Sequence, residues 1–172
     1  MAETGVHRED AADERPRHGR DESAEERADR RWVDLLQELR VAQTGMQILF
    51  GVLLIVVFQP AFATLGAADR ALYVTAVTLG AATVAALIAP VALHRMVAGR
   101  HIKPETVVLA AAIAKASMGM LAATMAAALL LLLRVAVDDT IAAVLTGVFA
   151  LWLLVLWLLL PMWARRHYSS RR

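Results

Sequence analysis

The residues with the most chemical potential are three polar side chains that lie inside apolar stretches. Lys115 is the only charged residue well inside such a run, and Gln43 and Gln47 lie one helical turn apart where another run begins. An ionisable residue in a membrane segment is by default a candidate functional site. Gln43, Gln47 and Lys115 therefore form a candidate intramembrane polar cluster, which could line a route for an ion or solute.

Each member of this cluster also has a structural explanation, and the sequence favours it. The run that contains Lys115 is longer than one membrane crossing needs, so the ammonium group can extend to the lipid headgroups. A pair of glutamines on one helix face more often hydrogen-bonds a neighbouring helix than lines a path. The alternative of a polar route stays open at this point.

Other catalytic or ligand-binding patterns are missing from the sequence. His94 and His101 flank a basic segment, but two histidines without a third ligand make a poor metal site. The chain has no cysteine, which excludes disulfides and thiolate chemistry. It also lacks a glycine-rich phosphate loop and a Ser-His-Asp set, and helix capping explains Asp138 and Asp139. We expect no catalytic, metal or cofactor-binding residues, no cofactor, and no enzymatic activity.

Four apolar runs organise the rest of the chain. Hydrophobic residues make up 59% of the sequence. The runs cover residues 45–65, 71–93, 106–133 and 141–163, and each reaches the ~20 residues that cross a ~30 Å hydrocarbon core. Short connections make successive helices antiparallel neighbours. The sequence predicts an all-α membrane protein with four transmembrane helices in an antiparallel up-down bundle.

The N-terminal region has two predicted parts. Residues 1–21 contain no Ile, Leu, Phe, Trp or Tyr and carry mixed charges, so we predict a disordered charged tail. Residues 22–43 form a predicted amphipathic juxtamembrane helix, which a capping box over residues 23–26 would start. Its apolar face comprises Trp32, Leu35, Leu36 and Leu39. The same face continues through Gln43, Met46, Gln47 and Phe50, so it predicts the inner seam of a transmembrane domain over residues 44–164.

The distribution of basic residues predicts the orientation in the membrane. One side of the predicted bundle carries Arg40, Arg95, Arg100, Lys103 and a basic tail over residues 165–172, whereas the other carries only Arg70 and Arg134. Both termini are therefore predicted to be cytoplasmic, and the protein to lie in the cell membrane. The candidate cytoplasmic-interface residues are Trp32, Glu38, Arg40, His94 and Arg95. Trp32, Trp163, Tyr168 and, on the outer side, Tyr73 are predicted interfacial anchors, and Asp69 and Asp139 are predicted helix caps.

Small residues recur every fourth position in three of the predicted helices. They are Ala76 and Gly80, then Gly119, Ala123 and Ala127, then Ala143 and Gly147. Such spacing favours close helix contact and a compact bundle.

Two stretches resemble a known family. Residues 35–50 (LLQELRVAQTGMQILF) and 89–95 (APVALHR) together resemble an uncharacterised family of small four-helix bacterial membrane proteins, known only as a domain of unknown function. The resemblance covers about residues 35 to 163. It implies a fold and a membrane location, but no activity, substrate or site residue.

The function hypotheses follow from this organisation. A nucleic-acid partner has little support, because the net charge is only +2 and the N-terminal tail mixes both signs. The leading hypothesis is a non-enzymatic partner-binding or regulatory membrane module, whose partners are the lipid bilayer and either a membrane protein or further copies of the chain. The alternative is a subunit of an oligomeric transporter or channel, in which the polar cluster lines a route.

Overall fold

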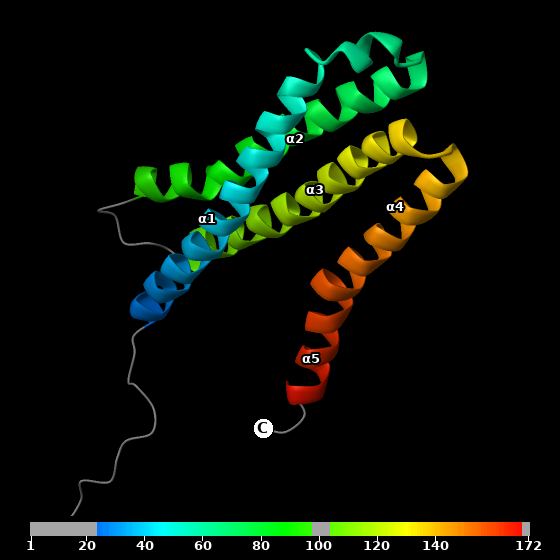
Figure 1. Ribbon diagram of the computed structural model, residues 1–172. Coiled ribbons are helices and arrows are strands. Elements are labelled where there is room, and N and C mark those ends of the chain that lie inside the picture. The colour runs from blue at the N-terminus through cyan, green and yellow to red at the C-terminus, as the bar shows by residue number, and fades with distance from the viewer. Residues whose placement is uncertain (1–23, 98–103, 170–172) are drawn as a thin grey trace, which may run out of the picture.

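The computed structural model describes residues 24–97 and 104–169, and this part of the chain is helical throughout apart from short connections (Figure 1). The elements are α1 (Ala24–Val56), η1 (Pro60–Thr64), α2 (Ala67–Val97), α3 (Pro104–Ala136), α4 (Asp139–Leu154), the π-helical turn η2 (Val155–Leu159) and α5 (Leu160–Ser169). Four of the described helical stretches are long and apolar enough to cross a membrane. This confirms the all-helical class and the four apolar helices.

Helix α1 joins the predicted juxtamembrane helix to the first apolar run without a break. The prediction that this run stays helical to residue 65 is wrong, because α1 ends at Val56 and a separate 3-10 helix begins at Pro60. Gln59 has an extended backbone, with φ −78° and ψ 140°. The residue before a proline is driven away from the α conformation, which explains the end of the helix here. The predicted capping residue Ser23 lies outside the described residues.

Helices α1 and α2 pack as antiparallel neighbours with a seven-residue repeat. The buried residues of α1 are Trp32, Leu39, Met46 and Leu53. Facing them on α2 are the half-buried His94 and the buried Leu87, Gly80 and Tyr73. Trp32 stacks on His94, a Cβ at Gly80 would meet Met46, and the Tyr73 hydroxyl donates to the Leu53 carbonyl. A seven-residue repeat of core positions is the pattern of coiled-coil packing. The predicted inner seam of α1 is thus confirmed at its apolar positions.

A second repeat on α2 faces α3. Ala76, Thr83 and Pro90 are buried on α2, and Ser117, Thr124 and Leu131 are buried on α3 at the same spacing. The hydroxyl oxygens of Thr83 and Thr124 lie 3.2 Å apart across this contact. Helix α2 therefore lies between its two sequence neighbours, and α1 also contacts α3. These three helices form the core of the protein.

Helix α4 packs on α3 and buries few of its own residues. Its buried residues are Ala142, Thr146 and Leu153. Figure 1 shows α4 and α5 diverging from the other helices toward the C-terminal end. A π-type turn forms at residues 155–159, where the Leu160 N–H bonds the Val155 carbonyl, directly before Pro161. Because proline cannot continue the regular α pattern, it explains the widened turn at this point.

The small-residue prediction holds for one helix and is wrong for two. Ala76 and Gly80 of α2 are buried against the other core helices. Gly119 and Ala123 of α3 are exposed, and so are Ala143 and Gly147 of α4. The four-residue spacing of small residues occurs in all three helices. Only the α2 pair lies on a helix face that packs against the other core helices.

Two predicted interfacial anchors are core residues instead. Trp32 is 1% exposed and Tyr73 is 7% exposed. Tyr73 also makes an edge contact with Phe62 of η1. Both aromatic rings therefore close the ends of the α1 and α2 contact. Trp163 of α5 is exposed and stacks on His167 one turn later.

Candidate functional site

Gln43 forms a side-chain hydrogen bond between helices. Its Nε2 donates to the backbone carbonyl of Leu87 on α2 at 2.7 Å. Leu87 lies in the turn before Pro90, and Pro90 has no N–H with which to continue the helical pattern. In membrane helices, carbonyl groups near a proline are commonly satisfied by side chains of neighbouring helices. Gln43 thus uses its donor to join α1 to the proline-containing turn of α2.

Gln47 lies on the surface beside Gln43. Its side chain is exposed, and both glutamines line a shallow depression with Val84, Leu87 and Ile88. The depression encloses essentially no space that a water-sized molecule could occupy. Small-molecule pockets usually have about 300 to 1,000 Å³, so this one is too small for a typical ligand site.

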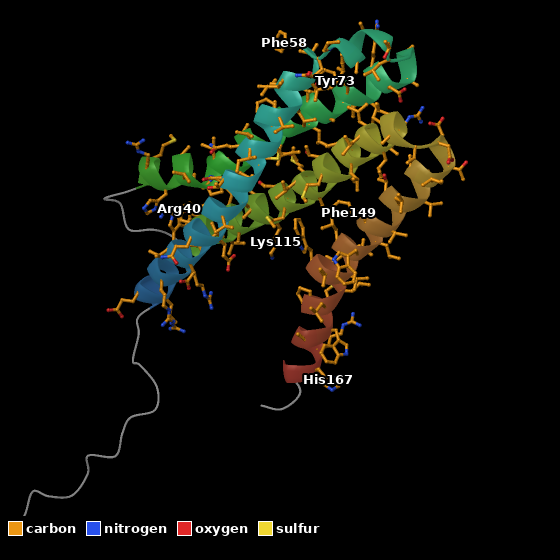
Figure 2. The ribbon with its side chains drawn as sticks, viewed as in Figure 1. Arg40, Phe58, Tyr73, Lys115, Phe149 and His167 are labelled. Atoms are coloured by element: carbon orange, nitrogen blue, oxygen red, sulfur yellow. The ribbon has the colours of Figure 1, made fainter. Side chains whose placement is uncertain are left out.

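Lys115 does not join the glutamines. It is exposed on α3, whereas the neighbouring Ala114 and Ser117 are buried in the core. Within the described residues, no hydrogen bond or ion pair connects Lys115 to Gln43 or Gln47. Figure 2 shows the Lys115 side chain on the surface of α3. The structure therefore brings together two members of the predicted polar cluster and leaves the third apart.

The predicted cytoplasmic-interface residues divide into a stacked pair, of which Trp32 is buried and His94 half-buried, and an exposed set. Trp32 and His94 stack with their ring centroids 5.3 Å apart and their planes at 29°. Trp32 Nε1 and His94 Nδ1 are both buried and have no hydrogen-bond partner. Glu38, Arg40 and Arg95 are exposed, and Figure 2 labels Arg40 on α1. His101 lies outside the described residues.

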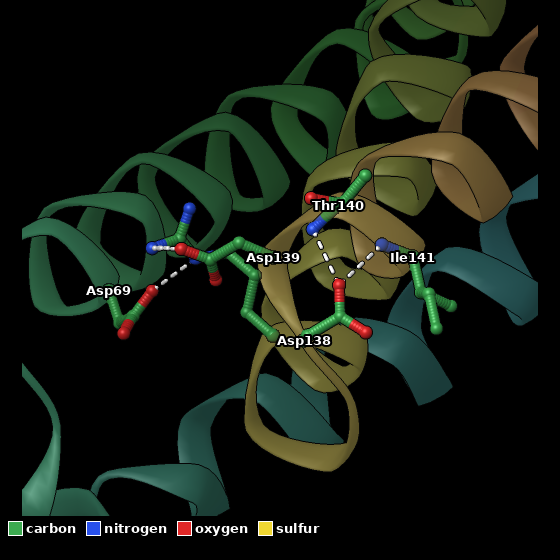
Figure 3. A network of polar contacts seen from close by, with 6 residues as sticks. Asp69, Asp138, Asp139, Thr140 and Ile141 are labelled. Carbon is green, nitrogen blue, oxygen red and sulfur yellow. Dashed lines mark hydrogen bonds and ion pairs between the residues drawn. The ribbon is translucent and has the colours of Figure 1, made fainter.

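A polar network joins three helices at the opposite end of the bundle (Figure 3). Arg134 Nε of α3 lies 2.6 Å from Asp69 Oδ1 of α2, and Arg134 Nη2 lies 3.5 Å from Asp139 Oδ2 of α4. The Asp138 carboxylate accepts hydrogen bonds from the N–H groups of Thr140 and Ile141, both at 3.0 Å. The predicted cap at Asp139 is therefore wrong by one residue, and Asp69 bonds an arginine rather than a helix terminus.

Buried hydroxyl groups in the core have partners in their own helices. Thr83, Ser117 and Thr124 each donate to the carbonyl four residues earlier, at 2.7 to 2.9 Å. Each hydroxyl group thus donates its hydrogen bond within its own helix. The Thr83 and Thr124 oxygens also form a polar contact between α2 and α3. Thr146 of α4 is the exception, because its buried Oγ1 has no partner.

The arrangement is suited to holding helices together. In the parts of the chain that the structure describes, no three histidine, aspartate or glutamate side chains gather at one point to hold a metal ion. Apart from Trp32 Nε1, His94 Nδ1 and Thr146 Oγ1, the buried polar side-chain atoms of the described residues are paired with carbonyl groups or with each other. Their chemistry is that of interhelical packing in an apolar medium.

Sequence reasoning missed the ion pair of Arg134 with Asp69. The signal was present, since both residues lie at helix ends on the side with few basic residues. Opposite charges at adjacent helix ends are good candidates for pairing. The hydroxyl contact between Thr83 and Thr124 left no comparable signal, because threonines are frequent in apolar helices and only the register of α2 on α3 selects this pair.

Comparison with protein families gives one match. A family model described as "Family of unknown function (DUF6328)" matches residues 21–161. The comparisons with curated proteins and with solved structures found no match. The match covers most of the chain, including all of α1 to α4, and confirms the resemblance to an uncharacterised family.

Proposed function

The chain belongs to DUF6328, a family of unknown function, and we propose that it is a non-enzymatic partner-binding module of the bacterial inner membrane. In this proposal a partner docks on the cytoplasmic part of α1. The observation that carries the proposal is that the Gln43 amide donates a hydrogen bond to the Leu87 carbonyl. This bond ties the Gln43 side chain to α2, which supports a structural role for it over a role in conduction or catalysis.

The proposed membrane position follows from the spacing of charged residues. Lys115 precedes Arg134 by 19 positions in α3, and Arg40 precedes Gln59 by 19 positions in and beyond α1. The α3 interval is helical throughout and spans ~29 Å, which is close to the ~30 Å thickness of the hydrocarbon core, whereas α1 ends at Val56. Lys115 and Arg40 are then placed at the cytoplasmic boundary, with Asp69 and Arg134 outside and both termini in the cytoplasm. Lys115 reaches the headgroups in this position.

This placement leaves residues 24–39 of α1 beyond the hydrocarbon core on the cytoplasmic side. The inner face of this extension is buried, as Trp32 and Leu39 show. Its outer face combines the charged Arg31, Asp34 and Glu38 with Val33, which is 54% exposed. An apolar residue among charges of both signs suits a protein surface better than lipid or nucleic acid. The partner is therefore proposed to be a membrane protein or a second copy of the chain.

Site-specific photocrosslinking in native membranes tests this proposal. A photoreactive residue at Val33 or Glu38 should give an adduct of discrete mass, because these side chains face the proposed partner. The matched control is Leu151 on α4, which is 60% exposed and is proposed to face lipid. Adducts at Leu151 should contain lipid only. A lack of protein adducts at both α1 positions would contradict the docking role.

The alternative is a subunit of an oligomeric transporter or channel. Gln47 supports it, since its amide is exposed beside Gln43 and would face a neighbouring copy in an assembly. A route would then form between copies rather than through one bundle. Solute flux in reconstituted vesicles that disappears in Gln47→Leu would favour this alternative over the docking role.

A further inference from the structure

The C-terminal end of α2 differs from the rest of the helix. Pro90 lies inside α2 and is fully buried. Sharp bends in helices are almost always located at proline, because its ring and missing N–H disrupt the preceding turn. Figure 1 shows the last turns of α2 leaving the line of the helix. Residues 91–97, which we call the α2 arm, therefore lie beyond a bend point.

Gln43 fixes the near side of this bend. Its hydrogen bond to the Leu87 carbonyl attaches α1 to the turn before Pro90. Leu39 and Leu87 are also buried in one apolar cluster on this side. The part of α2 before Pro90 is therefore held on α1 by both packing and hydrogen bonding.

The α2 arm makes an aromatic contact with α1. Ala92, Arg95 and Met96 are exposed, Val91 and Leu93 are half-buried, and His94 stacks on Trp32. That contact contains two buried nitrogens without partners, Trp32 Nε1 and His94 Nδ1. A buried polar atom without a partner opposes the closed arrangement, since water would satisfy it on opening. The charged residues next to the stack in sequence, Arg31, Asp34 and Arg95, are exposed, and none of them bonds His94 Nδ1.

We infer that the α2 arm is a hinged segment that swings about Pro90. In the closed state His94 stacks on Trp32, as in this structure. In the open state the arm leaves α1, both ring nitrogens reach water, and Gln43 stays on the Leu87 carbonyl. Opening uncovers the indole of Trp32 on the cytoplasmic part of α1. The arm then controls access to the proposed docking surface; this last step rests on the proposed function, whereas the motion does not.

Pulsed electron paramagnetic resonance on the full chain in lipid bilayers tests the motion. The chain has no cysteine, so spin labels attach only where cysteines are introduced. Arg31→Cys with Met96→Cys reports the arm, because both positions are exposed on either side of the stack. Ile48→Cys with Thr78→Cys is the control pair. These exposed positions lie on the same two helices, α1 and α2, but on the side of Pro90 that Gln43 fixes.

We expect two distance populations for the arm pair and one narrow population for the control pair. Trp32→Ala should enrich the longer distance, because it removes the stack. His94→Leu should enrich the shorter one, because leucine fills the contact without an unpartnered nitrogen. Pro90→Ala should merge the two populations into one.

Two results would overturn the inference. One is a single narrow arm distance that neither Trp32→Ala nor His94→Leu changes. The other is an equally broad distribution at the control pair, which would mean that the entire contact of α1 with α2 moves. The control pair also shows whether each variant is folded. Loss of photocrosslinks at Val33 with two arm populations intact would contradict the docking role and leave the hinge standing.

Discussion

Gly80 of α2 lies directly against Met46 of α1, so that a Cβ added at Gly80 would be 3.1 Å from Met46 Cε. The same added atom would be 3.1 Å from Phe50 Cδ2 and 3.6 Å from Thr124 Cγ2 of α3. The three core helices therefore meet at a point where only glycine leaves room. The seven-residue repeats of α1 and α2 bring these residues into one layer.

Gly80→Leu should destabilise the protein by ~1 to 3 kcal/mol, because extra atoms in a packed core force its neighbours to move. Gly80→Ala should cost less, since the end of the Met46 side chain can give way. Gly119→Leu is the control, as nothing lies within 4 Å of a Cβ at that position. Thermal unfolding in detergent, followed by circular dichroism, should show no loss for the control. Equal losses for Gly80→Leu and Gly119→Leu would disprove the assigned packing.

Gln43→Leu should lower stability by about 1 kcal/mol, the scale of a hydrogen bond between membrane helices. The reason is the lost donor to the Leu87 carbonyl. Gln47→Leu should change stability little, because the Gln47 side chain is exposed. Unfolding by denaturing detergent compares the two variants under identical conditions. A larger loss of stability for Gln47→Leu than for Gln43→Leu would show that Gln47, not Gln43, stabilises the contact between α1 and α2.

Asp69→Asn should destabilise the end of the bundle opposite the termini by about 1 kcal/mol, a value reduced to allow for partial exposure to solvent. Asp69 lies 2.6 Å from Arg134, and these side chains are only 21% and 29% exposed. Asp139→Asn should have almost no effect, because its oxygen is 3.5 Å from Arg134 and its side chain is 71% exposed. Raising the salt concentration should narrow the difference between the variants. Identical unfolding curves for both variants at low salt would refute the role of the pair.

Reporter fusions test the proposed orientation. A fusion after Arg172 and another after Arg100 should both report the cytoplasm, since basic residues gather at these ends. A fusion near Asp69 should report the outside. A periplasmic signal after Arg172 would mean an odd number of membrane crossings.

The sequence allowed the apolar seam of α1 to be predicted, because one helix face carries it from Trp32 to Phe50 in a regular pattern. The partners of that seam were not predictable. The pairing of Trp32 with His94 and of Met46 with Gly80 depends on the register of α2, which no local pattern determines. Trp32 was predicted as an interfacial anchor, because a tryptophan near a helix boundary suits an interfacial position as well as a core position.

The candidate site was predicted in part. Gln43 was expected to hydrogen-bond a neighbouring helix, and it does so at Leu87. Lys115 was grouped with it by depth alone, yet α3 turns Lys115 toward the surface. The depth of a residue along a membrane helix follows from its residue number. Whether its side chain points into the bundle or away from it depends on which face of the helix the neighbouring helices cover. Gly119 was assigned to a helix contact from its spacing in the sequence, although α4 leaves that face of α3 uncovered.

Solvent access to the core polar positions tests the central claim most directly, because a packed module and a conducting path differ in whether water reaches them. Gln43→Cys and Ser117→Cys should not react with a membrane-impermeant maleimide in intact membranes, since Ser117 is fully buried and position 43 is half-buried within the proposed hydrocarbon core. Lys115→Cys should be labelled from the cytoplasmic side only, and the native chain gives no background because it lacks cysteine. Rapid labelling of Gln43→Cys and Ser117→Cys in the folded protein would contradict the account and establish a water-filled route.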